Sequence, residues 1–158
     1  MSARPFRLSR RHRVVLYGLF ALLFASGFSW WLADEAEEEA GRAVAWAETL
    51  KPWALRVHGA VAMAFLVTLG TVLPLHAQKA WPSRINRRTG ILLASWFGLQ
   101  ALTGYGLLYL GKQVARDWAG QIHVTLGLLS ALVLAGHVLW GKRSMRRRNA
   151  SSPVTAGG

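Results

Sequence analysis

The 158-residue chain contains no cysteine and few acidic residues, and each shortage excludes some kinds of binding site or partner. Without cysteine it has no disulfide, no thiolate-bound zinc, no iron–sulfur cluster and no c-type haem attachment. A bound metal or haem would need histidine or carboxylate ligands. Only 7 Asp and Glu stand against 19 Lys and Arg, which gives a net charge of +12. Whether this surplus indicates nucleic-acid binding depends on where the bases lie along the chain.

Four long apolar stretches predict an all-α integral membrane protein with a four-transmembrane-helix bundle. The expected spans are residues 14–32, 53–76, 91–111 and 120–140. The first and third carry no charge over 19 and 21 positions, enough to cross a core of about 30 Å at about 1.5 Å per residue. The first apolar run is longer than that of a signal peptide and ends in Trp30 and Trp31, so we expect it to be retained. No fixed-period internal repeat is evident.

The charged residues are sorted between alternate polar segments. The N-terminal arm, the loop between the second and third spans and the C-terminal segment hold 14 of the bases and no acids, whereas all seven acids lie in the other two loops. The positive-inside rule therefore places both termini in the cytoplasm. The surplus is explained by orientation and contact with anionic lipid, so we expect no nucleic-acid partner. The predicted organisation is a basic arm at 1–13, a transmembrane domain at 14–141, and a basic, then disordered, tail at 142–158.

Four of the five histidines lie inside predicted spans, and their spacing is the main functional signal. His58 and His76 lie five helical turns apart in the second span, and His123 and His137 nearly four turns apart in the fourth. At about 100° per residue, each pair returns to nearly the same face of its helix. His58 and His123 also each follow a tryptophan by five residues, which matches their depths. Because both spans run inward, His58 can face His123 near the outer surface, and His76 can face His137 near the inner surface.

Two facing imidazoles are the ligand set of a six-coordinate haem iron, and a helix bundle offers a slot for the flat macrocycle. Zinc needs three or four converging ligands, and the sequence places no third ligand beside either pair. The sequence therefore predicts two haems stacked between the second and fourth helices. Arg56 could pair with a haem propionate, or it could extend to the outer interface instead. The competing interpretation is that the histidines form interhelical hydrogen bonds and bind nothing.

The stretches LRVHG, LPLHAQ, LTGY and IHVTLGLLSALVLAGH resemble the small bacterial di-haem cytochrome b membrane proteins of the cytochrome b-561 and formate dehydrogenase gamma-subunit kind. The resemblance covers roughly residues 12–143. It implies two low-spin haem b groups in the bacterial inner membrane, electron transfer across that membrane, and often a quinone partner. In several members the inner haem takes a ligand from the start of the first span. His12 lies at that point here, so it remains an alternative to His76.

Three functions remain open at this point. The first is electron transfer between the quinone pool and a periplasmic redox partner, such as a c-type cytochrome or an oxidoreductase subunit. The acidic run DEAEEE at 34–39 is a candidate docking face for such a partner, or a plain solvated loop. The second is a self-contained quinone-linked oxidoreductase that acts on superoxide or ferric iron. The third is a non-redox membrane scaffold with structural histidines. Self-association of the chain is left open.

Overall fold

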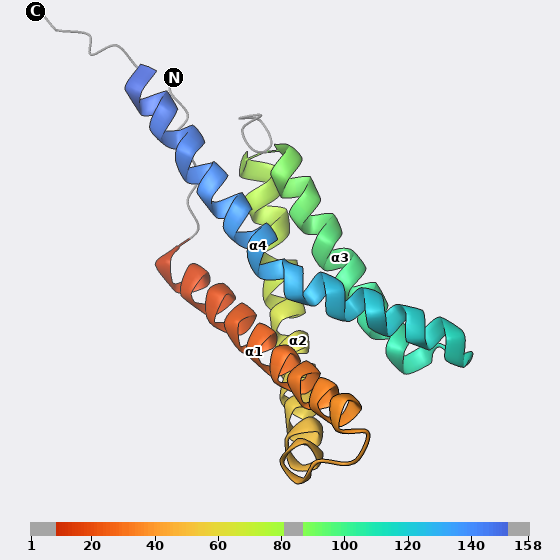
Figure 1. Cartoon of the computed structure of the whole chain (residues 1–158). Coiled ribbons are helices and arrows are strands. Elements are labelled where there is room, and N and C mark those ends of the chain that lie inside the picture. The colour runs from red at the N-terminus through yellow and green to blue at the C-terminus, as the bar shows by residue number, and fades with distance from the viewer. Residues whose placement is uncertain (1–8, 81–86, 152–158) are drawn as a thin grey trace, which may run out of the picture. The chain divides into compact units, whose positions relative to one another are not determined.

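The structure, a computed structural model, describes residues 9–80 and 87–151 and is helical almost throughout them. The helices are α1 (Arg10–Ala40), α2 (Ala45–Ala80), α3 (Arg87–Tyr109) and α4 (Gln113–Ser151) (Figure 1). Each contains a segment long and apolar enough to cross a membrane. The predictions of an all-α, multi-pass membrane protein and of four spans are confirmed. α3 ends at Tyr109 and α4 begins at Gln113, so residues 110–112 connect them.

The helices extend beyond the predicted spans and leave short connections. α1 continues through the acidic run and ends at Gly41, whose left-handed φ of 58° lets its N–H donate to the Glu38 carbonyl oxygen at 3.1 Å. This conformation suits glycine because it has no Cβ. At the other end of the chain, α4 continues to Ser151, so the tail predicted at 142–158 begins as helix. Acidic residues that we expected in loops therefore lie on helical turns.

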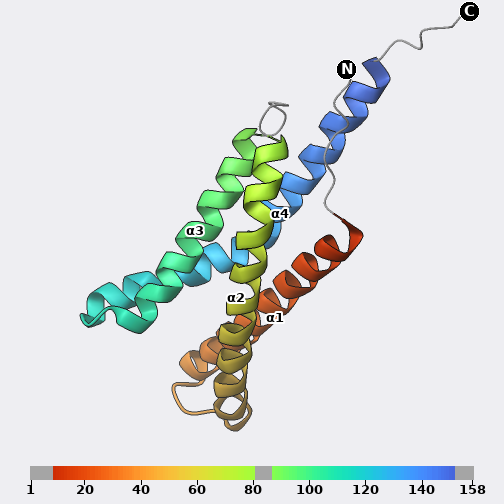
Figure 2. The same ribbon diagram turned by 180° about the vertical axis from the view of Figure 1, so that it is seen from behind.

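The chain divides into two compact units, residues 1–79 and 80–158. We call α1 with α2 the first hairpin, and α3 with α4 the second hairpin. Within each one the chain reverses direction, at residues 41–44 in the first and at 110–112 in the second (Figures 1 and 2). We call this end of a hairpin its connecting end, and the other end its open end.

The first hairpin is held by aromatic and ionic contacts between its two helices. Phe20 of α1 and Phe65 of α2 have ring centroids 6.4 Å apart, and Phe65 is buried. Near the connecting end, the Lys51 Nζ lies 2.5 Å from an Asp34 oxygen and 2.9 Å from a Glu37 oxygen. These pairs place α1 and α2 in one antiparallel register. The acidic run is thus partly engaged within the hairpin rather than wholly solvated.

The second hairpin has a polar ladder along its helix–helix seam. Three contacts join α3 to α4 at steps of seven residues on each helix: Thr103 with His123, Trp96 with Ser130, and Thr89 with His137. In the middle rung, the Trp96 indole N–H donates to the Ser130 oxygen at 3.0 Å, and Ser130 is buried. A seven-residue step is the repeat that keeps two helices in contact along a seam. Both histidines of α4 therefore face α3.

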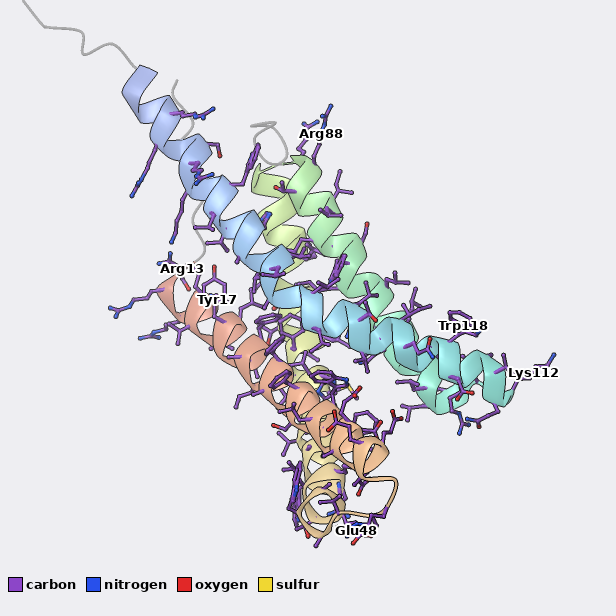
Figure 3. The ribbon with its side chains drawn as sticks, in the orientation of Figure 1. Arg13, Tyr17, Glu48, Arg88, Lys112 and Trp118 are labelled. Atoms are coloured by element: carbon purple, nitrogen blue, oxygen red, sulfur yellow. The ribbon has the colours of Figure 1, made fainter. Side chains whose placement is uncertain are left out.

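The outer surfaces of the helices are apolar, while charged side chains gather at the ends. Large apolar side chains stay widely exposed in both hairpins, including Leu108 at 76% and Met63 at 69%. In the first hairpin Glu48 lies at the connecting end and Arg13 at the open end; in the second, Lys112 and Trp118 lie at the connecting end and Arg88 at the open end (Figure 3). Such a surface suits lipid along the helices and water or headgroups at their ends.

The two hairpins share residues at corresponding positions of their helices, although no fixed period relates them, and we call this correspondence the repeat. The sequence of α1 aligns without gaps on that of α3, and the sequence of α2 aligns without gaps on that of α4. Identical residues then coincide: Arg10 with Arg87, Phe20 with Phe97, Gly27 with Gly104, Trp53 with Trp118, Ala54 with Ala119, and His58 with His123. Ala54 and Ala119 are both buried, so the repeat extends to the packing. The two hairpins thus share a local residue pattern around His58 and His123.

Candidate functional site

His58 of α2 packs against one turn of α1. Its Nδ1 lies 3.1 Å from the Leu23 carbonyl oxygen and 3.2 Å from the Ser26 hydroxyl oxygen. The Ser26 hydroxyl in turn donates to the Leu23 carbonyl at 3.0 Å. Beside them, a Cβ added at Gly27 would lie 3.0 Å from the His58 Cε1. We call this set the cradle of the histidine ring. It consists of the Leu23 carbonyl, the Ser26 hydroxyl three residues later and Gly27 four residues later.

His123 of α4 has the same cradle on α3. Its Nδ1 lies 3.1 Å from the Gln100 carbonyl oxygen and 3.1 Å from the Thr103 hydroxyl oxygen. The Thr103 hydroxyl is within hydrogen-bond distance of the Gln100 carbonyl, at 3.0 Å. A Cβ at Gly104 would lie 3.0 Å from the His123 Cε1. In the alignment of α1 with α3, Leu23, Ser26 and Gly27 correspond to Gln100, Thr103 and Gly104, so the repeat preserves the cradle.

These cradles determine which ring nitrogen carries the proton. A carbonyl oxygen can only accept, so an Nδ1 bonded to it must be the N–H donor. In a neutral imidazole, the other nitrogen, Nε2, then has no hydrogen and holds a lone pair. Metal-binding histidines in proteins commonly show this arrangement, with one nitrogen hydrogen-bonded to a carbonyl and the other directed at the metal. Both His58 and His123 are therefore held in the tautomer whose Nε2 lone pair suits a metal bond.

The glycines explain how the rings approach the neighbouring helix so closely. A Cβ at 3.0 Å from a ring carbon would stand well inside ordinary van der Waals contact, so a side chain there would push the ring away. By contrast, a Cβ at Gly18 of α1 or Gly98 of α3 would meet nothing within 4 Å. Gly27 and Gly104 are therefore needed for the close approach of the histidine rings, whereas the helices themselves would accept a larger residue at these positions.

The other predicted site residues lie as follows. The His137 Nδ1 is 3.3 Å from the Thr89 hydroxyl oxygen, in the last rung of the polar ladder. His76 lies on α2, but its side chain is outside the described residues. The Arg56 guanidinium lies over the Trp53 ring, 5.0 Å from its centroid. His12 lies in the first turn of α1, with its Nδ1 2.7 Å from the Ser9 hydroxyl oxygen.

No family model, curated protein or solved structure matches this chain. The function must therefore be argued from the two cradles and the chemistry of their residues.

The donor set fits a haem better than a bare metal ion. Among residues 9–80 and 87–151, no group of three or more His, Cys, Asp or Glu side chains could hold a metal ion. A bare ion needs such a group, whereas a porphyrin supplies four nitrogens itself and asks the protein only for axial ligands. Two imidazoles with carbonyl-fixed tautomers meet that requirement. The pairing of His58 with His123 stays a prediction.

In the second hairpin, the Gln100 side chain adds a polar group near the Nε2 side of the His123 ring. Its amide nitrogen donates to the His123 carbonyl oxygen at 3.0 Å and lies 3.4 Å from the His123 Nε2. The longer contact is too long for a strong hydrogen bond, so it would compete weakly with an iron at that nitrogen. Its Oε1 is buried without a hydrogen-bond partner in the described part of the chain. The first hairpin has Leu23 at the matching position.

The sequence analysis identified the histidines but missed the residues that hold them. Ser26 and Gly27 were not recognised, and LTGY was noted only as part of a resemblance. The signal that could have found them is a hydroxyl residue, a glycine and an aromatic in succession. It occurs as Ser26-Gly27-Phe28 in α1 and as Thr103-Gly104-Tyr105 in α3.

Proposed function

We propose that the chain is a transmembrane electron-transfer protein that holds two b-type haems between pairs of histidines. His58 and His123 are the axial ligands of the outer haem iron in this proposal, and His137 is one ligand of the inner iron. The chemistry that the haems supply is reversible one-electron transfer at iron. The chain's own residues fix the imidazoles, set their basicity and keep water from them.

The observation that carries the proposal is the repeated cradle. An interhelical hydrogen bond needs only one such contact, whereas each histidine here has a carbonyl acceptor, a hydroxyl and a glycine against its ring. Here both hairpins use the same three elements to leave Nε2 as the lone-pair nitrogen. The arrangement favours a ligand role over a purely structural one. It also argues against the non-redox scaffold among the functions left open by the sequence.

The experiment that tests the proposal is a reduced-minus-oxidised absorption spectrum of the purified chain, together with its haem-to-protein ratio. We expect a b-type alpha band and two haems per chain. A colourless protein from cells well supplied with haem would contradict the proposal. A ratio of one haem per chain would restrict it to one site.

The inner haem has two candidate ligands in the first hairpin. His76 is the ligand that spacing along α2 predicts. His12 is the alternative: it aligns with Thr89 of α3, but its side chain is exposed and its Nδ1 lies 2.7 Å from the Ser9 hydroxyl oxygen. In the second hairpin, Thr89 contacts His137. The α2 position that matches His137 is Val72, which is buried, and His76 lies four residues beyond it.

Single alanine variants distinguish the two candidates. We expect His76→Ala to lose the inner haem and His12→Ala to keep both, because His76 matches His137 in depth, whereas His12 is exposed in the first turn of α1. The measurement is the haem-to-protein ratio, with the spectrum of the remaining haem as a check. Loss of a haem from His12→Ala alone would instead assign the inner iron to His12.

The orientation and partners follow from the charges at the hairpin ends. We propose that both open ends lie in the cytoplasm, because the bases at Arg10, Arg11, Arg87 and Arg88 begin α1 and α3. The connecting ends then lie in the periplasm of a bacterial inner membrane. Glu38, Glu39 and Glu48 are exposed at the connecting end of the first hairpin and would attract a basic redox partner such as a c-type cytochrome. Quinone is the proposed partner within the membrane.

The role of Arg56 is part of the same proposal. Its guanidinium is held over the Trp53 ring, two residues before His58 in sequence. A cation–π contact leaves the N–H edges of the guanidinium able to bond an anion. We therefore retain Arg56 as a candidate partner for a propionate of the outer haem.

A further inference from the structure

Each cradle contains a hydroxyl that lies against the histidine of the neighbouring helix. Ser26 and Thr103 lie on different helices of different hairpins, yet their oxygens stand 3.2 Å and 3.1 Å from a histidine Nδ1. The Ser26 hydroxyl donates to the Leu23 carbonyl at 3.0 Å, and the Thr103 hydroxyl can donate to the Leu99 carbonyl at 2.9 Å or to the Gln100 carbonyl at 3.0 Å. Their own hydrogens are directed at the backbone, so the lone pairs are left for the ring N–H.

The Nδ1–H is therefore shared between two acceptors, the carbonyl and the hydroxyl. Sharing of this kind pulls the proton further from the ring and makes Nε2 a stronger electron donor. A stronger donor stabilises ferric over ferrous iron, which lowers the reduction potential. The hydroxyl can thus affect the potential of an iron that it does not touch.

We propose that Ser26 and Thr103 are positioning residues which hold His58 and His123 as Nδ1–H donors and thereby set the reduction potential of the outer haem. The effect on potential rests on the proposed function, since it requires the two histidines to bind haem iron. The effect on the tautomer does not, because the cradles are complete within each hairpin.

The first experiment measures the tautomer in the haem-free protein by ¹⁵N NMR of labelled histidine. We expect His58 and His123 to carry the proton on Nδ1 in the unaltered chain. In Ser26→Ala and Thr103→Ala the carbonyl acceptor remains, so the matching histidine should keep the proton on Nδ1 but form a weaker Nδ1–H hydrogen bond, seen as a shift of its ¹⁵N and proton resonances. Assignment comes from His58→Gln and His123→Gln, which each remove one set of signals.

The second experiment is a redox titration of the haem-loaded protein with the same variants. Loss of one acceptor should raise the potential of the outer haem, with a roughly two- to tenfold shift of the ferric-to-ferrous ratio at a fixed potential. Ser26→Thr and Thr103→Ser keep a hydroxyl and should restore the original ratio. The controls are Ser29→Ala and Thr68→Ala, whose hydroxyls donate to the Ala25 and Ala64 carbonyls of their own helices.

The outcomes separate this inference from the proposed function. If the chain binds no haem but both histidines are Nδ1–H donors that respond to Ser26→Ala and Thr103→Ala, the proposed function fails and the positioning role stands. If haem binds but the Nδ1–H resonances and the potential do not respond, or respond equally in the two controls, the positioning role is overturned. An Nε2–H tautomer in the unaltered chain would overturn it as well.

Discussion

His58→Ala and His123→Ala are each expected to remove half of the low-spin haem signal while the other half stays intact. On the proposed pairing, each change deletes one axial ligand of the outer iron and leaves the inner one complete. The outer haem is then either lost or left five-coordinate and high-spin, and both results remove its share of the alpha band. The measurements are the haem-to-protein ratio and the spectrum of the reduced protein.

A rescue experiment separates loss of a ligand from loss of the fold. In His58→Gly and His123→Gly, added imidazole should enter the vacated space and restore the low-spin band. Because both histidines would serve the same iron, the double variant should lose no more of the signal than either single variant. If the double variant lost twice as much, the two histidines would serve different irons and their predicted pairing would be wrong.

The spans were predictable because hydropathy alone decides them. An uncharged run such as residues 14–32 has no stable place in water, and helix is the conformation that satisfies its backbone within lipid. The helix ends were not predictable in the same way. α1 extends to Ala40 through five acidic residues because Lys51 neutralises two of them and glycine ends the helix at Gly41. The ion pairs depend on Lys51 of α2, and the amino-acid composition of α1 does not show that Lys51 lies beside it.

The histidines were predictable from their cost in a membrane, but their cradles were not. An intramembrane imidazole stands out against an apolar background, whereas Ser26 and Gly27 are ordinary residues for a membrane helix. Their role depends on an antiparallel register that places α1 beside His58. The repeat was hidden for a related reason. The connection between the shared parts is longer in the first hairpin than in the second, so no single period relates the two halves.

Gly27→Ala and Gly104→Ala are expected to weaken haem binding by roughly 10- to 100-fold, the range found when groups supporting a metal ligand are altered. The added Cβ would lie 3.0 Å from the Cε1 of His58 or His123, so the ring must move by a few tenths of an ångström. That movement lengthens the Nδ1–H bonds to the carbonyl and hydroxyl acceptors and turns Nε2 away from its position. The measurement is haem retention during titration with a competing haem-binding protein.

Gly18→Ala and Gly98→Ala are the matched controls, one on each of the same two helices. A Cβ at either position meets nothing within 4 Å, and alanine favours helix over glycine by roughly 0.5–1 kcal/mol. These variants should therefore keep their haem and unfold at an equal or higher temperature. Gly27→Ala and Gly104→Ala gain the same helix preference, so a fall in haem affinity there cannot come from a weakened helix. If all four variants behaved alike, close approach of the imidazoles to α1 and α3 would have no part in holding the cofactor.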